Sequence, residues 1–286
     1  MDCPICQNLS DRIFQKNGFW IRECKSCHHR YTEITPSGDH PEQIYQDDYF
    51  FGGADGYPDY LAEAKILSAH GKRYGNLLKK FTSPGTLLDV GAAAGFILKG
   101  FQETGWQGVG VEPNFSMAEY ARTQLGIQMI TGSLEQLPSG QQFDLVSMIQ
   151  VVAHFYDLRQ ALQKAADVTK LGGFWLIETW DRASWAARLF GKNWQEYTPP
   201  GVLHWFSPAG IKQLANQFGF VEVARGRPAK YISGMHAKSL FRYSLQAPRL
   251  GWLRDMINII PDQLVIPYPP VDLFWILLQK NKNAGS

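Results

Sequence analysis

The sequence predicts an α/β fold in which helices cover both faces of a mostly parallel sheet. Two observations indicate this class. From residue 86 onward, short apolar runs alternate with helical stretches, which is the pattern of βαβ units in a doubly wound sheet. The first apolar run also ends in a turn of small residues, DVGAAAG over 89–95, where the backbone can lie close to a ligand.

The expected elements follow one another in a regular order. A connector rich in Pro, Gly, Asp and aromatic residues occupies 36–58, and a helical stretch runs from there to about residue 81. The elements expected next are strand 86–90, helix 95–104, strand 107–112, helix 114–124, strand 127–131, strand 143–149, helix 157–170, strand 173–179, helix 207–219, strand 220–226 and strand 271–279. The clearest helix ends are those of 207–219, where Ser207 can cap the helix and Pro208 suits its first turn.

Composition indicates a globular protein. The chain has 286 residues, of which 45% are hydrophobic and 19% charged, and its net charge of +2 gives no argument for binding nucleic acid. No secretory signal is visible, and no apolar run approaches the roughly 18 residues of a membrane span. We therefore expect a cytoplasmic protein.

All four cysteines lie near the N-terminus, as Cys3-x-x-Cys6 and Cys24-x-x-Cys27. Two such pairs can deliver four thiolates to a tetrahedral zinc ion, which is the pattern of a zinc ribbon. The alternatives are two disulfides or a redox pair, but disulfides are rare in the cytoplasm and a redox motif needs no second copy. The spacing favours a structural zinc site.

These observations divide the chain into three parts. We expect a zinc ribbon at 1–35, a connector with an N-terminal helix at 36–82, and the α/β domain at 83–286. Within that domain the loop 180–206 and the amphipathic segment 227–270 exceed what a minimal sheet needs. We predict that 227–270 is a helical insertion that forms a lid, because loops beyond the carboxyl ends of strands cover ligands.

The turn after the first strand favours one ligand over another. Asp89 precedes Gly91 by two residues, where its charge would repel the pyrophosphate of a dinucleotide but attract an ammonium and a sulfonium. Glu112, at the end of the next strand, is placed to accept two ribose hydroxyls. These residues point to S-adenosylmethionine, and the alternative is a nicotinamide-dependent oxidoreductase.

The segments LLDVGAAAGF, GVEPN and GSLEQLP resemble class I S-adenosylmethionine-dependent methyltransferases, with Ala93 in place of the middle glycine of the turn. The resemblance covers about residues 45–281 and is greatest to the ubiquinone-type O-methyltransferase branch. It implies a seven-stranded Rossmann-like sheet. The cofactor-binding residues that it implies are Asp89, Gly91, Ala93, Gly95, Glu112, Pro113, Leu134 and Gln150.

Two histidines are candidate catalytic residues. His154 follows the fourth expected strand, where relatives commonly show Glu-His, and His204 lies in the loop 180–206. A neutral imidazole over the acceptor could take a hydroxyl proton during methyl transfer. For each, the alternative is a structural histidine.

The expected function is therefore methyl transfer to a small-molecule acceptor, at oxygen or carbon. An RNA- or protein-modifying methyltransferase is the alternative within the same class. The apolar and basic side chains of 227–270 also suit transient contact with a membrane surface or a lipid-linked substrate.

Overall fold

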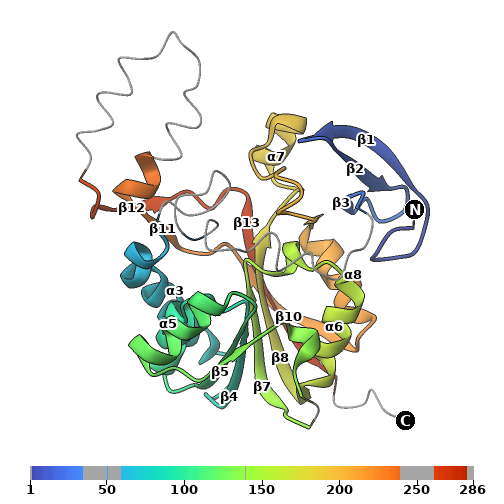
Figure 1. Ribbon diagram of the computed structural model, residues 1–286. Coiled ribbons are helices and arrows are strands. Elements are labelled where there is room, and N and C mark those ends of the chain that lie inside the picture. Colours follow the sequence, from blue (N-terminus) through green and yellow to red (C-terminus); the bar gives the residue numbers. More distant parts are fainter. Residues whose placement is uncertain (1, 35–49, 51–58, 139, 239–260, 282–286) are drawn as a thin grey trace.

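The computed structural model describes residues 2–34, 50, 59–138, 140–238 and 261–281, and its centre is a seven-stranded sheet (Figure 1). The order of the strands is β10-β13-β8-β7-β4-β5-β6. Their bounds are β4 Thr86–Val90, β5 Gln107–Glu112, β6 Met129–Thr131, β7 Phe143–Ile149, β8 Thr169–Trp180, β10 Phe220–Gly226 and β13 Leu273–Lys280. The predicted seven-stranded α/β sheet is confirmed.

The sheet has a topological switch point at its centre. The chain runs outward from β4 through β5 to β6, then returns to β7 and runs outward on the other side. Pairing is parallel from β6 to β8, whereas β13 lies antiparallel between β8 and β10. Ligands of open α/β sheets bind beyond the carboxyl ends of the strands at such a point, here β4 and β7.

Helices cover both faces of the sheet. Their bounds are α3 Ala64–Leu78, α4 Phe96–Gln102, α5 Phe115–Leu125, α6 Leu158–Asp167, α7 Trp185–Phe190 and α8 Pro208–Asn216. The apolar sides of α3, α4 and α5 pack on one face, and those of α6 and α8 pack on the other (Figure 1). Helix α8 begins as predicted, with the Ser207 side chain accepting the Gly210 amide and Pro208 in its first turn.

Glycines bring α3 close to α4. A Cβ atom at Gly71 would lie 2.0 Å from the carbonyl oxygen of Ile97, and one at Gly100 would lie 2.0 Å from that of Ser68. No larger residue fits at this distance, so the two helices meet backbone to backbone. This contact fixes α3 beside the carboxyl edge of β4, where it covers the candidate site.

The N-terminal unit is completed by a strand from the α/β domain. Strands β1 Ser10–Lys16, β2 Phe19–Cys24 and β3 Arg30–Thr32 form an antiparallel sheet, and β9 His204–Trp205 pairs with β3 as its fourth strand. We call β1, β2, β3 and the two cysteine turns the ribbon. Its Cys3, Ile5 and Cys24 are buried in the same apolar cluster as Phe206 and Ile211.

The insertion 227–270 differs from the helical prediction at its described ends. Strands β11 Lys230–Ser233 and β12 Val265–Tyr268 pair as an antiparallel two-stranded sheet, and a helical turn at 234–238 follows β11. The β-branched Ile232, Val265 and Ile266 favour this pairing, and Pro269 and Pro270 prevent a helix after it. The segment 239–260, on which most of that prediction falls, lies outside the described residues.

Candidate functional site

The turn after β4 is a tight turn with several residues in the left-handed conformation. Gly91, Ala93 and Gly95 all have positive φ, at 64°, 46° and 79°. A Cβ atom at Gly91 would lie 2.4 Å from Val151 Cγ2, so glycine is required there. Ala93 adopts the left-handed conformation despite its Cβ atom, a strain that tertiary contacts must offset.

The acids Asp89 and Glu112 end two neighbouring parallel strands. Both are buried, at 3% and 4% exposure. Asp89 Oδ1 accepts the hydroxyl of Ser147 at 2.5 Å, while the two oxygens of Glu112 accept the amides of Ala93 and Asn114 at 2.8 Å. Burial raises the pKa of each carboxyl to about 7, and the charge of Glu112 contributes to the raised pKa of Asp89.

One cavity joins these acids to most of the predicted cofactor residues. The predicted residues that line it are Asp89, Gly91, Ala93, Glu112, Pro113, Leu134, Gln150 and His154. Gly95 does not line it. It precedes α4, where a Cβ atom would lie 2.9 Å from Ile127 Cδ1. The cavity therefore lies at the switch point of the sheet, with the turn after β4 as its floor.

Gln150 is held in one orientation by Glu178. Its side-chain Nε2 donates to Glu178 Oε1 at 2.8 Å, and its backbone amide donates to the Glu178 carbonyl at 2.9 Å. Gln150 also has a positive φ of 59°. Its Oε1 is buried and has no hydrogen-bond partner among the described residues. Because a buried unpaired acceptor is costly, this oxygen is suited to receive a donor from a ligand.

The sequence analysis missed a group of side chains around Glu178. The Glu178 carboxylate, from β8, accepts a hydrogen bond from His70 Nε2 at 2.8 Å and from the Tyr74 hydroxyl, both on α3. His70 Nδ1 in turn lies 3.3 Å from an Arg73 nitrogen. Burial alone would raise the pKa of Glu178, but the charge and hydrogen bond of His70, then the charge of Lys230 and the hydrogen bond of Tyr74, lower it to about 2.

His154 and His204 occupy different environments. His154 lines the cavity, and its Nδ1 lies 2.7 Å from the Gly201 carbonyl. His204 is not among the described residues that line the cavity, so its expected position over the acceptor is not observed. Pairing of β9 with β3 brings His204 Nδ1 to 3.3 Å from His29, while His204 Nε2 contacts the Phe155 carbonyl at 3.0 Å.

The rest of the cavity wall is largely aromatic and apolar. The lining also includes Phe50, Tyr60, Phe155, Tyr156 and Tyr231, together with Ile66 and Leu67 of α3. Two cations, Arg73 and Lys230, also line the cavity. The wall therefore suits an apolar or planar molecule beside the polar floor.

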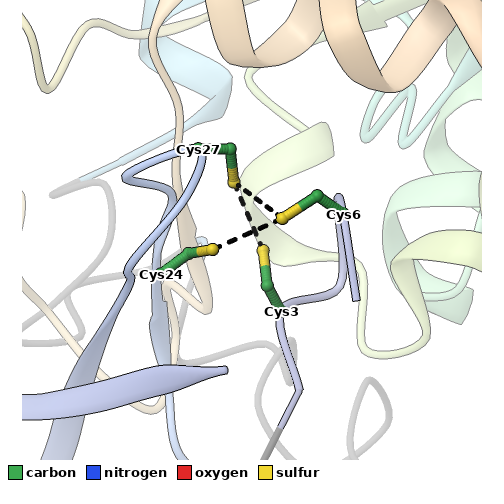
Figure 2. A group of neighbouring side chains, drawn as sticks. All are labelled: Cys3, Cys6, Cys24 and Cys27. Carbon is green, nitrogen blue, oxygen red and sulfur yellow. Dashed lines mark hydrogen bonds between the residues drawn. The ribbon is translucent and has the colours of Figure 1, made fainter. Parts of the chain in front are cut away.

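The four cysteines converge on one point (Figure 2). The sulfur atoms of Cys3 and Cys6 each lie 3.5 Å from that of Cys27, and Cys6 lies 3.4 Å from Cys24. All four sulfurs lie within 4.8 Å of one another. Within the described residues, this is the one such group of potential ligands.

Comparison with known proteins identifies the family. A family model described as a methyltransferase domain matches residues 64–224, more than half of the chain. The chain therefore belongs to this methyltransferase family, and its fold is that of class I S-adenosylmethionine-dependent methyltransferases. No described helix is both long and apolar enough to cross a membrane.

Curated relatives include two ubiquinone biosynthesis O-methyltransferases. That of Rhodopseudomonas palustris is 28% identical over 42% of this chain and 50% of its own length, and that of Nitrobacter winogradskyi is 30% identical over 46% and 54%. The chain thus spans about half the length of the curated relatives it matches.

Solved structures share the fold at low sequence identity. The magnesium protoporphyrin IX methyltransferase of Synechocystis superposes with a TM-score of 0.54 at 12% identity, over 84% of this chain and all of the other. The 1,6-didemethyltoxoflavin-N1-methyltransferase of Burkholderia thailandensis gives 0.53 at 13% identity, over 95% and 99%. At these identities the likeness concerns the fold alone.

Replacing Glu178 should destabilise the protein in a pH-dependent way. Its folded-state pKa of about 2 lies below the ordinary value of 4.5, so its contribution is fully present above about pH 4.5 and is lost as the pH falls toward 2. We expect Glu178→Gln to lower the free energy of unfolding by about 1–3 kcal/mol at pH 7. The difference in the free energy of unfolding between Glu178→Gln and wild type should become smaller below pH 4.5.

Urea unfolding at several pH values measures this difference. Glu103→Gln is the control, since Glu103 forms an exposed ion pair with Lys72 and should change stability little. A deficit of the same size at pH 3 and pH 7 would contradict the assignment of Glu178 as an ionised, hydrogen-bonded group.

Proposed function

We propose that the protein transfers the methyl group of S-adenosylmethionine to a small-molecule acceptor, at a hydroxyl oxygen or an activated carbon. One observation carries the proposal: two buried carboxylates on adjacent parallel strands face one cavity across a turn of small residues. The proposal also draws on the family match and on the aromatic side chains that line the same cavity.

The chain offers partners for each part of the cofactor. Glu112 retains lone pairs beyond its two amide contacts, and these can accept ribose hydroxyls. Asp89 and the unpaired Oε1 of Gln150 suit the positively charged methionine end. Pro113 and Leu134 give apolar contact for the adenine. When bound, S-adenosylmethionine supplies a methyl group on a positively charged sulfur.

The raised pKa values of both acids are consistent with this assignment. Burial without a counter-charge favours the protonated forms of Asp89 and Glu112, whereas a cationic ligand favours the ionised forms. Since the chemistry is a displacement at the methyl group, alignment of the acceptor is the protein's main contribution, worth up to about 7–11 kcal/mol.

Removing the Glu112 carboxylate should weaken cofactor binding. We expect Glu112→Ala to cost about 1.5–3 kcal/mol of binding free energy, because hydrogen bonds to a charged group are lost. Calorimetry with S-adenosylmethionine measures the effect, with Glu119→Ala on the outer face of α5 as control. Equal affinity in the Glu112 variant and wild type would remove Glu112 from the site.

His154 is our candidate for the base, in preference to His204. His154 lines the cavity. A carbonyl oxygen can only accept, so Nδ1 of His154 donates to Gly201, and a backbone contact with Gln150 also holds the ring. Burial lowers the pKa of His154, which keeps the ring neutral near pH 7. By contrast, His204 is not among the described residues that line the cavity, and its ring nitrogens contact the Phe155 carbonyl and His29.

Turnover should fall when His154 is replaced. We expect His154→Ala to lower the rate by about 10²–10⁴ while cofactor affinity stays nearly unchanged. In wild type the rate should fall as the pH drops below the ordinary histidine value of about 6.5, because the ring then becomes protonated.

The assay follows label from the cofactor into acceptors of a cell extract from the source organism. It also identifies the product. Glu112→Ala is the contrasting variant, since it should lose cofactor affinity instead. A His154 variant with wild-type turnover would leave alignment as the whole mechanism.

We further propose that Cys3, Cys6, Cys24 and Cys27 hold one structural zinc ion. A tetrahedral site with Zn–S bonds of about 2.3 Å places its sulfurs about 3.8 Å apart, close to the spacing here. The amides of Ile5 and Ser26 lie 3.4 Å from Cys3 and Cys24 sulfurs, where they can donate to thiolates. Four thiolates complete the shell, so the metal has no place for substrate.

Metal analysis should find one zinc per chain. Because binding of a structural zinc is coupled to folding, its removal by a chelator should lower the melting temperature. Cys24→Ser, which removes a buried ligand, should reduce the zinc content in the same way. Under half an equivalent of zinc in metal-replete protein would count against the site.

Helix α7 supports transient contact with an anionic membrane surface. Its Trp185, Leu189 and Phe190 are 62%, 70% and 56% exposed, and the cations Arg188 and Lys192 beside them form no ion pair among the described residues. Together the three side chains expose on the order of 400 Å², less than the ~800 Å² per partner of a standard protein interface. Apolar side chains among cations suit anionic lipid.

Vesicle sedimentation tests this contact. We expect binding to vesicles that contain phosphatidylglycerol and much weaker binding to pure phosphatidylcholine, with a loss of about 1 kcal/mol per cation removed. Changing Trp185, Leu189 and Phe190 together to serine should abolish binding. Leu171→Ser is the control, because Leu171 is equally exposed at the opposite end of β8. Equal binding of both variants would contradict the proposal.

A further inference from the structure

Two buried histidines connect the ribbon to the α/β domain. His29 follows the second cysteine pair, and its carbonyl accepts the Cys24 amide at 2.9 Å. Its ring stacks on that of His204, with centroids 5.5 Å apart and planes 21° apart. His204 Nε2 then contacts the Phe155 carbonyl at 3.0 Å. Both histidines are buried.

The direction of each hydrogen bond follows from the last acceptor. The Phe155 carbonyl can only accept, so His204 Nε2 carries a proton. In a neutral ring Nδ1 of His204 is then an acceptor, and it accepts a hydrogen bond from the N–H at Nε2 of His29. This leaves Nδ1 of His29 without a proton, and within the described chain that atom has no partner. Two hydrogen bonds in the same direction thus lead from the ribbon to Phe155: His29 donates to His204, and His204 donates to the Phe155 carbonyl.

This chain ends at the cavity wall. Phe155 lines the cavity, as do His154 before it and Tyr156 after it. These residues belong to or follow η3 Val152–His154, a single turn that gains little support from its own hydrogen bonds. A second contact holds the same turn from behind, since the Leu203 amide donates to the Ala153 carbonyl at 2.9 Å. Leu203 in turn accepts the Thr32 amide of the ribbon at 2.8 Å.

We propose that His29 and His204 are positioning residues that hold η3 and Phe155 in place, so that the ribbon forms the outer support of the acceptor side of the cavity. The inference deepens the proposed function and rests on it for the meaning of that side. Neither histidine lines the cavity, so each acts through Phe155. The floor formed by Asp89, Gly91 and Glu112 is supported separately, by β5 and Ser147.

The test compares variants that keep or remove the directed hydrogen bonds. His204→Phe keeps an aromatic ring but leaves the Phe155 carbonyl unpaired. His29→Phe removes only the hydrogen bond from His29 to His204. His204→Gln places a donor near the former Nε2 atom and should restore much of the effect. His28→Asn is the matched control, since His28 is exposed, adjacent and at a positive φ that asparagine tolerates.

Three measurements separate positioning from general stability. Hydrogen exchange is followed in peptides covering 151–156 and, for comparison, 86–95. Calorimetry gives the affinity for S-adenosylhomocysteine. Label transfer is measured at rising extract concentration. In His204→Phe we expect exchange at 151–156 and the half-saturating extract concentration each to rise about tenfold, with cofactor-product affinity within about twofold of wild type.

Distinct results overturn the inference. Unchanged exchange at 151–156 in both phenylalanine variants would remove the support role. An equal rise in exchange at 86–95, or a loss of affinity for S-adenosylhomocysteine as large as the loss of transfer, would mean general destabilisation. If wild-type protein transfers no label to the extract while the selective exchange response persists, the proposed function fails and the ribbon's support of η3 stands.

Discussion

The candidate site depends on where the Glu112 carboxylate lies. One oxygen accepts the amide of Ala93 in the turn after β4, and the other accepts the amide of Asn114 at the start of α5. One buried acid therefore fixes both turns at the switch point of the sheet and gives the floor of the cavity its shape. Its desolvation is offset only partly by these two amides, which is why burial still raises its pKa.

The rest of the cavity wall is built from segments outside the central sheet. Helix α3 contributes His70 and Arg73, the insertion contributes Lys230 and Tyr231, and η3 is held from behind by the ribbon. These segments are far apart in the sequence and meet only through tertiary contacts. Since the floor comes from the ends of the sheet strands and the rest of the wall from other segments, the two parts can differ independently in what they bind.

The sequence allowed predictions only for the parts of the candidate site that depend on local spacing. Asp89, Glu112 and the cysteine pairs lie at fixed offsets within single turns or strands, so their chemistry follows from neighbouring residues. Glu178 and His70 are 108 residues apart, and no local pattern joins them. His204 differed from expectation because β9 has only two residues, too few for a periodic signal that would predict its pairing with β3.

Charge is divided across the cavity in a way that bears on its ligand. Glu178 already accepts hydrogen bonds from His70, Tyr74 and Gln150, whereas Asp89 and Glu112 on the floor, and Glu135, are further acids that line the cavity. The cations Arg73 and Lys230 also line the cavity, and neither forms an ion pair within the part of the chain that the structure describes. Burial lowers the pKa of Arg73, which indicates that its charge is poorly compensated. A ligand that carries both signs, as S-adenosylmethionine does through its sulfonium, ammonium and carboxylate, would supply counter-charges to the acids and to the cations of the cavity.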